Sequence, residues 1–149
     1  MIVEQSKQII AEVNKAFIGR KDIVEKILMT IYAGGHVLLE DCPGVGKTTL
    51  AVAFSRALGL SNKRVQFTPD TLPSDITGFT MYSRETGRFE YREGAANCQL
   101  LLADEINRTS PKTQSALLEV MEEGNVTVDG VTREVPKPFI VIATQNPIG

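Results

Sequence analysis

Apolar residues recur at helical spacing in two stretches near the start of the chain. The first stretch places five of them on one face, at Ile2, Ile9, Ile10, Val13 and Phe17. The second stretch does the same with Ile23, Val24, Ile27, Leu28 and Ile31. This spacing predicts two amphipathic helices. Residues 18–21 separate them, Asp22 is suited to cap the second helix, and Gly34 and Gly35 end it.

Short apolar runs and amphipathic helices alternate along the rest of the chain. The runs predict four buried strands, over residues 37–40, 64–68, 100–103 and 139–143. Helices are predicted over 47–58, with Leu50, Ala51, Phe54 and Leu58 on one face, and over 111–123, where Ser110 caps and Pro111 begins the helix. This alternation indicates an α/β fold built on a parallel sheet.

Two further segments carry the period-two pattern of β-hairpins. Residues 79–91 alternate in polarity around the turn Glu85-Thr86-Gly87, within an otherwise irregular stretch over 69–94. Residues 126–131 alternate around Asp129-Gly130, a dipeptide typical of tight hairpin turns. The sequence therefore predicts two hairpins added to the α/β core.

Composition narrows the class of protein. The chain has 149 residues, 42% of them hydrophobic and 23% charged, which is typical of one globular domain. A net charge of −2 gives no basic excess for nucleic acid, and no apolar run is long enough to span a bilayer. Cys42, Cys98 and His36 are too few for a disulfide framework or a zinc site. No leader segment is visible at the N-terminus, so a cytoplasmic location is expected.

The turn between the first predicted strand and the following helix has phosphate-binding character. Gly44 and Gly46 allow close backbone approach, and the helix start directs N–H groups and its positive dipole end at one point. Lys47 would reach the β- and γ-phosphates, and the Thr48 hydroxyl would bind Mg²⁺. Asp41 stands where the P-loop pattern has its first glycine. The alternative is an ordinary strand-to-helix turn with a solvated lysine.

Polar residues follow two of the later apolar strands. Asp104 is placed to hold Mg²⁺ through water, and Glu105 to activate a water for attack on the γ-phosphate. Asn146 follows the last strand, where a neutral amide could contact the γ-phosphate. The alternatives are a solvated strand end for Asp104 and Glu105 and a simple turn for Asn146. Ligands bind at the carboxyl ends of parallel strands, and this position favours the proposed roles.

These motifs resemble those of the MoxR-type AAA+ ATPases. Five stretches match the family in order, over residues 38–48, 66–78, 101–108, 112–119 and 142–147. The resemblance covers nearly the whole chain, and Asp41 is typical of the family's P-loop. The segment 94–98 (Gly-Ala-Ala-Asn-Cys) departs from the family's usual Gly-Pro, branched residue and Phe, and we expect looser packing there.

The resemblance implies specific roles for residues of this chain. It implies an ATP-binding set of Pro43, Gly44, Val45, Gly46, Lys47, Thr48 and Thr49, with Ile18 and Gly19 near adenine. It implies Mg²⁺ binding by Thr48 and Asp104, and catalytic roles for Glu105, Lys47 and the sensor 1 residue Asn146. Residues 79–91 correspond to the helix-2 insert and 125–135 to the pre-sensor-1 hairpin, which in related ATPases face the pore or the substrate.

The resemblance also implies an architecture. A P-loop three-layer sandwich is expected, with strand order 1-4-3-2 and a fifth strand that would lie beyond Gly149. The arginine finger, sensor 2 and helical lid of the family also follow that position. Residues 1–149 would thus be a partial AAA+ α/β core. We expect these residues alone to be marginally stable, to bind nucleotide weakly and to hydrolyse it negligibly.

The implied function is ATP binding and Mg²⁺-dependent hydrolysis, driving in the full-length form chaperone-like remodelling or metal-cofactor maturation of partner proteins. A protein substrate or a von Willebrand A-type partner and a homo-hexamer are expected. One alternative is a GTP-binding switch, suggested by Asp75–Gly78 but opposed by the lack of an Asn-Lys-x-Asp motif. Another is a nucleotide-binding or interaction module without turnover.

The remaining conspicuous side chains have simple interpretations. Cys42 could be a redox switch but suits a small buried filler better, and His36 suits a structural role. Three arginines of the first hairpin fit a solvated face, namely Arg84, Arg88 and Arg92. Arg108 could reach a neighbouring subunit's nucleotide or pair with the local acidic groups.

Overall fold

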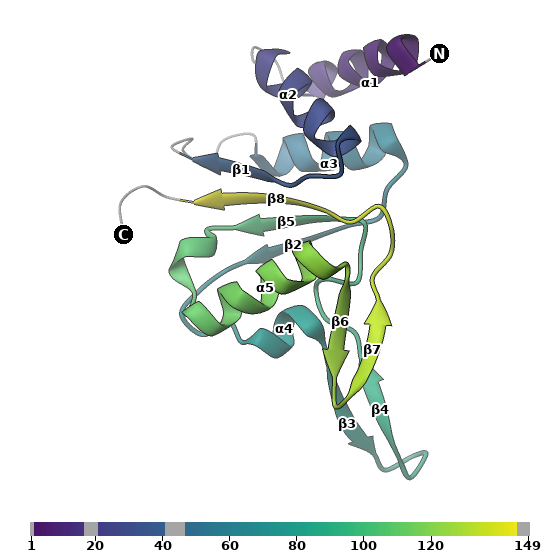
Figure 1. Ribbon diagram of the computed structural model, residues 1–149, viewed down its shortest axis with the longest axis vertical. Coiled ribbons are helices and arrows are strands. Elements are labelled where there is room, and N and C mark those ends of the chain that lie inside the picture. Colours follow the sequence, from purple (N-terminus) through teal and green to yellow (C-terminus); the bar gives the residue numbers. More distant parts are fainter. Residues whose placement is uncertain (1, 17–20, 41–46, 146–149) are drawn as a thin grey trace.

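The computed structural model describes residues 2–16, 21–40 and 47–145 (Figure 1). Its helices are α1 (Ile2–Ala16), α2 (Lys21–Tyr32), α3 (Lys47–Leu58), α4 (Pro73–Thr77), the 3-10 helix η1 (Ile106–Arg108) and α5 (Pro111–Glu123). Its strands are β1 (Val37–Glu40), β2 (Asn62–Gln66), β3 (Phe79–Ser83), β4 (Arg88–Arg92), β5 (Leu100–Asp104), β6 (Asn125–Val128), β7 (Val131–Glu134) and β8 (Ile140–Gln145).

Four of the strands form a parallel sheet in the order β1-β8-β5-β2. In sequence order these are strands one, four, three and two, so the predicted order 1-4-3-2 is confirmed. The two central strands pair in register, with Leu100 opposite Ile140 and Leu102 opposite Ile142. Their side chains are almost wholly buried, because a central strand of a parallel sheet is covered on both faces.

Helices cover both faces of the sheet and give the three predicted layers (Figure 1). On one face, α2 and α3 pack against side chains such as Leu100 and Leu102 of β5. On the other face, α4 and α5 pack against Leu101 and Ala103. Successive side chains of a strand point to opposite faces, so the single run 100–103 supplies both cores. No helix in the described ranges 2–16, 21–40 and 47–145 is long and apolar enough to cross a membrane.

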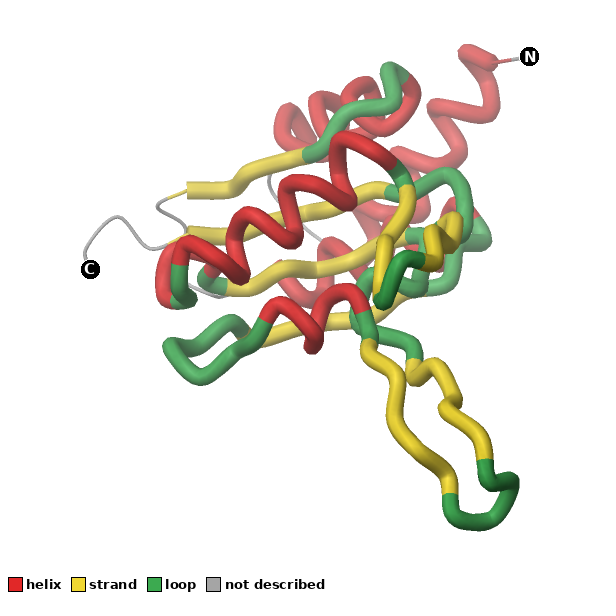
Figure 2. Tube along the Cα trace, turned by 60° about the horizontal axis from the view of Figure 1, so that its bottom comes forward, coloured by secondary structure: helices red, strands yellow, loops and turns green. Residues whose placement is uncertain are grey.

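Both predicted hairpins are present, and both lie outside the main sheet (Figure 2). The hairpin β3-β4 extends away from the body, and β6-β7 lies near its base. Asp129 and Gly130 form the β6-β7 turn with φ angles of 51° and 76°, the left-handed conformation that Asp-Gly favours. The Thr80 hydroxyl donates a hydrogen bond to the Asp129 carboxylate and so links the two hairpins.

The structure corrects several details of the predicted elements. The second strand covers Asn62–Gln66 and not 64–68, because its ladder with β5 ends where Gln66 faces Asp104. The last strand covers Ile140–Gln145 and extends two residues beyond the predicted 139–143. The stretch 69–94 also contains a short helix, α4, which buries Ile76 completely.

The segment 94–98 packs tightly, so the expectation of loose packing there is wrong. Ala96 and Cys98 are only 1% and 2% exposed. The backbone N–H groups of Ala95 and Ala96 donate to the carbonyl oxygens of Asp75 and Ile76, at 2.9 and 3.0 Å. Small side chains allow this close approach of two backbone segments, and so replace the bulkier packing of the family pattern.

Replacing Gly94 by alanine is expected to destabilise the fold by about 1–3 kcal/mol, the usual cost of overpacking. A Cβ atom at this position would overlap the backbone of Gly78 and Ile76, which cannot move like a flexible side chain. Urea unfolding would measure the loss. Gly35→Ala is the matched control, because its Cβ would meet the Thr30 methyl at 3.1 Å and the Thr30 carbonyl oxygen at 3.6 Å, without a backbone overlap. Equal stability of the two variants would contradict the packing described here.

The buried thiol of Cys98 is expected to make stability fall at alkaline pH. Burial raises its pKa from 9.0 to about 11. Because the folded protein holds this proton more tightly than the unfolded chain, the stabilisation is complete below pH 9 and is lost as the pH rises toward 11. Urea unfolding at pH 8 and 10.5 should show a larger loss for the parent protein than for Cys98→Ala. Identical losses would show that Cys98 does not titrate in this range.

Candidate functional site

The parallel strands bring their carboxyl ends to one edge of the sheet, called here the carboxyl edge. Glu40 at the end of β1 pairs with Gln145 at the end of β8, and Asp104 ends the neighbouring strand β5. Helix α3 begins at Lys47, and only six residues separate it from the end of β1 at this edge. Such an edge is where ligands bind in parallel α/β sheets.

Several predicted nucleotide-binding residues lie outside the described part of the chain. These are Ile18, Gly19, Pro43, Gly44, Val45, Gly46 and Asn146, together with Asp41 and Cys42. Lys47 and Thr48 are placed in the first turn of α3, and Thr49 beside them is exposed. The start of this 12-residue helix is thus where the phosphate-loop prediction required it.

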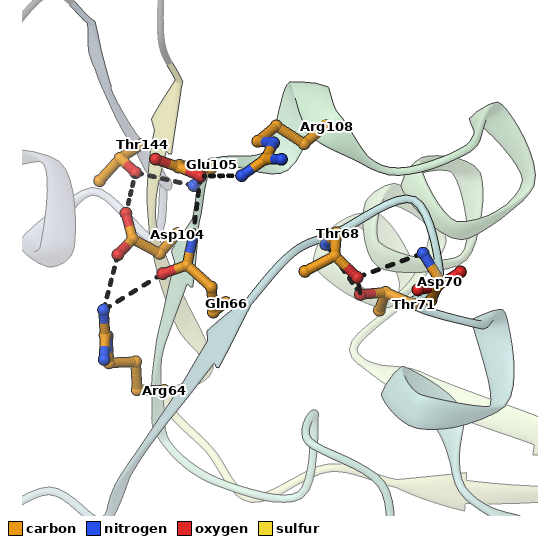
Figure 3. Close-up of polar contacts among 9 residues, drawn as sticks. All are labelled: Arg64, Gln66, Thr68, Asp70, Thr71, Asp104, Glu105, Arg108 and Thr144. Atoms are coloured by element: carbon orange, nitrogen blue, oxygen red, sulfur yellow. Dashed lines mark hydrogen bonds and ion pairs between the residues drawn. The ribbon is translucent and has the colours of Figure 1, made fainter.

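Asp104 is held from two sides at the end of β5 (Figure 3). The hydroxyl of Thr144, a fully buried residue of β8, donates to its Oδ1. The guanidinium of Arg64 on β2 lies 3.0 Å from its Oδ2. The Asp104 side chain remains 18% exposed. Contacts from both neighbouring strands therefore fix the direction of this carboxylate.

Glu105 adopts a left-handed backbone conformation, with φ 56° and ψ 52°. This conformation costs a residue other than glycine about 1–3 kcal/mol, and such strain is concentrated at functional sites. The Glu105 N–H donates to Thr144 Oγ1 at 2.9 Å. Its carboxylate accepts a 2.8 Å hydrogen bond from Gln66 and pairs with Arg108 at 3.2 Å (Figure 3).

Together these contacts form an oriented pair of carboxylates at the edge that leads into α3. A carboxylate oxygen is a suitable ligand for Mg²⁺, so Asp104 fits a metal-binding role. Glu105 keeps 27% of its side chain exposed and can therefore reach a water molecule. The arrangement can thus hold a cation and take a proton from water at neighbouring positions.

The sequence did not reveal the residues that hold this pair. Thr144 was not among the predicted site residues, but its hydroxyl bonds both to Asp104 and to the Glu105 backbone. A usable signal existed, because Thr144 is a polar residue that directly continues a buried apolar run. Arg64 and Gln66 carried no comparable signal, because their contacts depend on the pairing of β2 with β5.

Other predicted roles can be compared with the structure. His36 fits its structural interpretation, because its Nδ1 accepts from the Val141 N–H at 3.0 Å and its Nε2 lies 3.1 Å from the Met121 carbonyl oxygen. Arg108 pairs locally with Glu105, which is one of its two predicted alternatives. The first-hairpin arginines are exposed, as expected of a solvated face, namely Arg84, Arg88 and Arg92.

Comparison with known proteins gives the family. The model of the "ATPase family associated with various cellular activities (AAA)" matches residues 36–149. The chain belongs to this AAA ATPase family. It is a MoxR-type member, as the resemblance predicted. It is 55% identical to YeaC of Bacillus subtilis over 139 residues, covering 93% of this chain and 43% of YeaC.

Two further matches cover nearly the whole chain. Chaperone MoxR1 of Mycobacterium tuberculosis is 45% identical over 146 residues, covering 98% of this chain and 39% of MoxR1. A crystal structure of a protein from Cytophaga hutchinsonii superposes with a TM-score of 0.87 at 42% identity, over 98% of this chain and 44% of that protein. The chain thus spans about two-fifths of the length of these relatives.

Proposed function

We propose that the chain binds ATP and ADP with Mg²⁺ at the carboxyl edge, and that Glu105 serves as the base for ATP hydrolysis. The observation that carries the proposal is the bridging hydroxyl of Thr144. It bonds to the Asp104 carboxylate and to the Glu105 backbone N–H, and so fixes both acidic residues at once. Membership of the AAA ATPase family supports the same activity.

The proposed role of each residue follows from the chemistry of its functional group. The backbone of residues 43–46 and the Lys47 ammonium would bind the phosphates at the start of α3, where the helix dipole favours negative charge. Thr48 and Asp104 would hold Mg²⁺, which when bound neutralises phosphate charge. Glu105 would accept a proton from the attacking water, and Asn146 would orient that water or the γ-phosphate. Ile18 and Gly19 would contact adenine.

The test is nucleotide binding by the 149-residue chain, measured with a fluorescent ATP analogue. We expect binding that requires Mg²⁺ for full affinity and is displaced by ATP and ADP but poorly by GTP. Displacement by GTP alone would favour the switch-type alternative. Absence of binding at millimolar nucleotide would refute the proposed site. Hydrolysis by these residues alone is expected to be negligible, because the family's arginine finger is not among them. In related phosphoryl transfer such an arginine raises turnover about a thousandfold or more.

We further propose that the longest form of the protein remodels partner proteins. The support is the MoxR1 relative, which is named a chaperone. A homo-hexamer in the cytoplasm, acting on a protein substrate or a von Willebrand A-type partner in cofactor maturation, fits this role. Analytical ultracentrifugation with and without ATP would test the assembly. A monomer under both conditions would contradict the hexamer while leaving nucleotide binding intact.

A further inference from the structure

Figure 1 shows the two hairpins, β3-β4 and β6-β7, close to each other. Residues at their bases line a polar pocket away from the carboxyl edge. Its volume is about 240 Å³. Its polar lining comes from α4, β4, the segment before β5, and β7, through Thr77, Tyr91, Glu93, Asn97, Arg133 and Glu134. The proposed nucleotide chemistry uses none of these residues.

Arg133 forms one wall of the pocket by stacking on an aromatic ring. Its guanidinium carbon lies 3.8 Å from the centroid of the Tyr91 ring. The Tyr91 hydroxyl donates to the Thr77 carbonyl oxygen, which holds the ring in place. A cation over an aromatic face is stabilised, but the guanidinium N–H groups still require acceptors in the plane of the group.

One of these donors has no acceptor. The Nη1 atom of Arg133 is buried and has no hydrogen-bond partner among residues 2–16, 21–40 and 47–145. Buried polar groups are nearly always paired in native structures, and a charged donor left unpaired is especially costly. Arg133 is a lining residue of the pocket, so an acceptor bound there would lie beside its guanidinium.

The other charged residues around the pocket limit the negative charge that a bound ligand can carry. Glu93 and Glu134 both border the pocket, and Glu134 pairs with Lys137 at 3.2 Å. Arg133 and Lys137 thus balance two carboxylates, so each further negative charge is opposed by Glu93 and a doubly charged phosphate is disfavoured more than a singly charged group. A single carboxylate adds only one charge and can accept two parallel N–H bonds from a guanidinium.

The apolar residues of the lining indicate the chemical nature of the ligand. Ile76, Ala96, Val126 and Val135 also border the pocket, and all four are buried. They offer contacts to methylene groups, and the Asn97 carboxamide offers a further N–H donor. This combination of one cation, one amide and an apolar wall suits an aliphatic acid.

We propose that this pocket binds an aliphatic carboxylate of a peptide, with Arg133 as the charged partner. Two sources present this chemistry, an acidic side chain and a peptide C-terminus. The Thr80–Asp129 hydrogen bond already joins the two hairpins nearer the β6-β7 turn, so a bound carboxylate would join them a second time at their bases. Carboxylate binding at this pocket does not require nucleotide binding at the carboxyl edge.

The test uses three capped tripeptides with the ¹⁵N-labelled 149-residue chain. Ac-Ala-Glu-Ala-NH₂ presents a side-chain carboxylate, Ac-Ala-Gln-Ala-OH a terminal one, and Ac-Ala-Gln-Ala-NH₂ neither. We expect at least one acidic peptide to shift the Arg133 Nε–H resonance and the amide of Val126, while the neutral peptide leaves both in place. Which acidic peptide binds distinguishes the two sources.

Substitutions decide whether Arg133 is responsible. Arg133→Met removes the charge and should weaken the binding of the acidic peptide about tenfold or more. Arg88→Met removes an exposed hairpin arginine and should leave it unchanged. If Arg133→Met does not fold, Arg133→Lys retains a charge but not the paired N–H geometry, and should also weaken binding. Equal shifts with the neutral peptide, or unchanged binding by the Arg133 variant, would overturn the proposal.

Discussion

Replacing Lys47 by alanine is expected to lower the affinity for ATP and ADP by about tenfold to a hundredfold, the usual cost of losing a charge-assisted hydrogen bond. Helix α3 begins at this residue, at the edge where β1 and β8 end. The backbone N–H groups of the turn and helix would remain, so residual binding is expected. Calorimetry with ATP in the presence of Mg²⁺ measures the difference.

A matched control separates a local effect from a loss of overall positive charge. Lys112→Ala removes an exposed lysine from the first turn of α5, which is also a helix N-terminus. This variant should bind ATP as the parent chain does. Unchanged affinity in Lys47→Ala would mean that the phosphate-loop assignment is wrong, because Lys47 is the only side-chain cation proposed to contact the phosphates.

Elements with strong local signals were predictable from the sequence. Helix α5 begins and ends as predicted because Ser110 caps it, with the Thr113 N–H donating to its hydroxyl, and because Gly124 ends it with a φ of 72°. The turn at Asp129-Gly130 fixes the β6-β7 hairpin in the same way. In each case the signal lies within a few residues, so the rest of the fold is not needed to interpret it.

Elements that depend on their partners were predicted less well. The second strand was predicted over 64–68, but the β5 ladder sets its range at Asn62–Gln66. Phe67 keeps one backbone bond to Asp104, at 2.9 Å, and its side chain is buried beyond the strand end. Helix α4 was missed because its five residues carry only one fully buried apolar side chain, Ile76.

The residues of the candidate site also fall into two groups, those visible in the local sequence and those that depend on strand pairing. Asp104 and Glu105 could be proposed from the sequence, because an apolar run followed by two acidic residues is visible locally. The side chains that orient them lie about 40 positions away in sequence: Gln66 bonds to Glu105, and Thr144 and Arg64 to Asp104. Only the register of three strands brings these groups together, and no local pattern encodes that register.

The contacts of Glu105 make its replacement the sharpest test of hydrolysis. Glu105→Gln retains the size and planarity of the side chain and can still accept hydrogen bonds from Gln66 and Arg108 through its amide oxygen. The left-handed backbone and the bond to Thr144 do not involve the side chain and should persist. What disappears is the negative charge that draws a proton from water.

We therefore expect Glu105→Gln to bind ATP normally but to hydrolyse it about 100- to 10,000-fold more slowly, the range that general base catalysis supplies. The assay uses the longest form of the protein that its gene encodes, with phosphate release and nucleotide binding measured on the same preparation. Glu119→Gln, an exposed charge on α5, is the control and should retain the parent rate. Hydrolysis by Glu105→Gln at the parent rate would exclude Glu105 as the base, whereas a parallel loss of binding would indicate that its charge supports the site's structure.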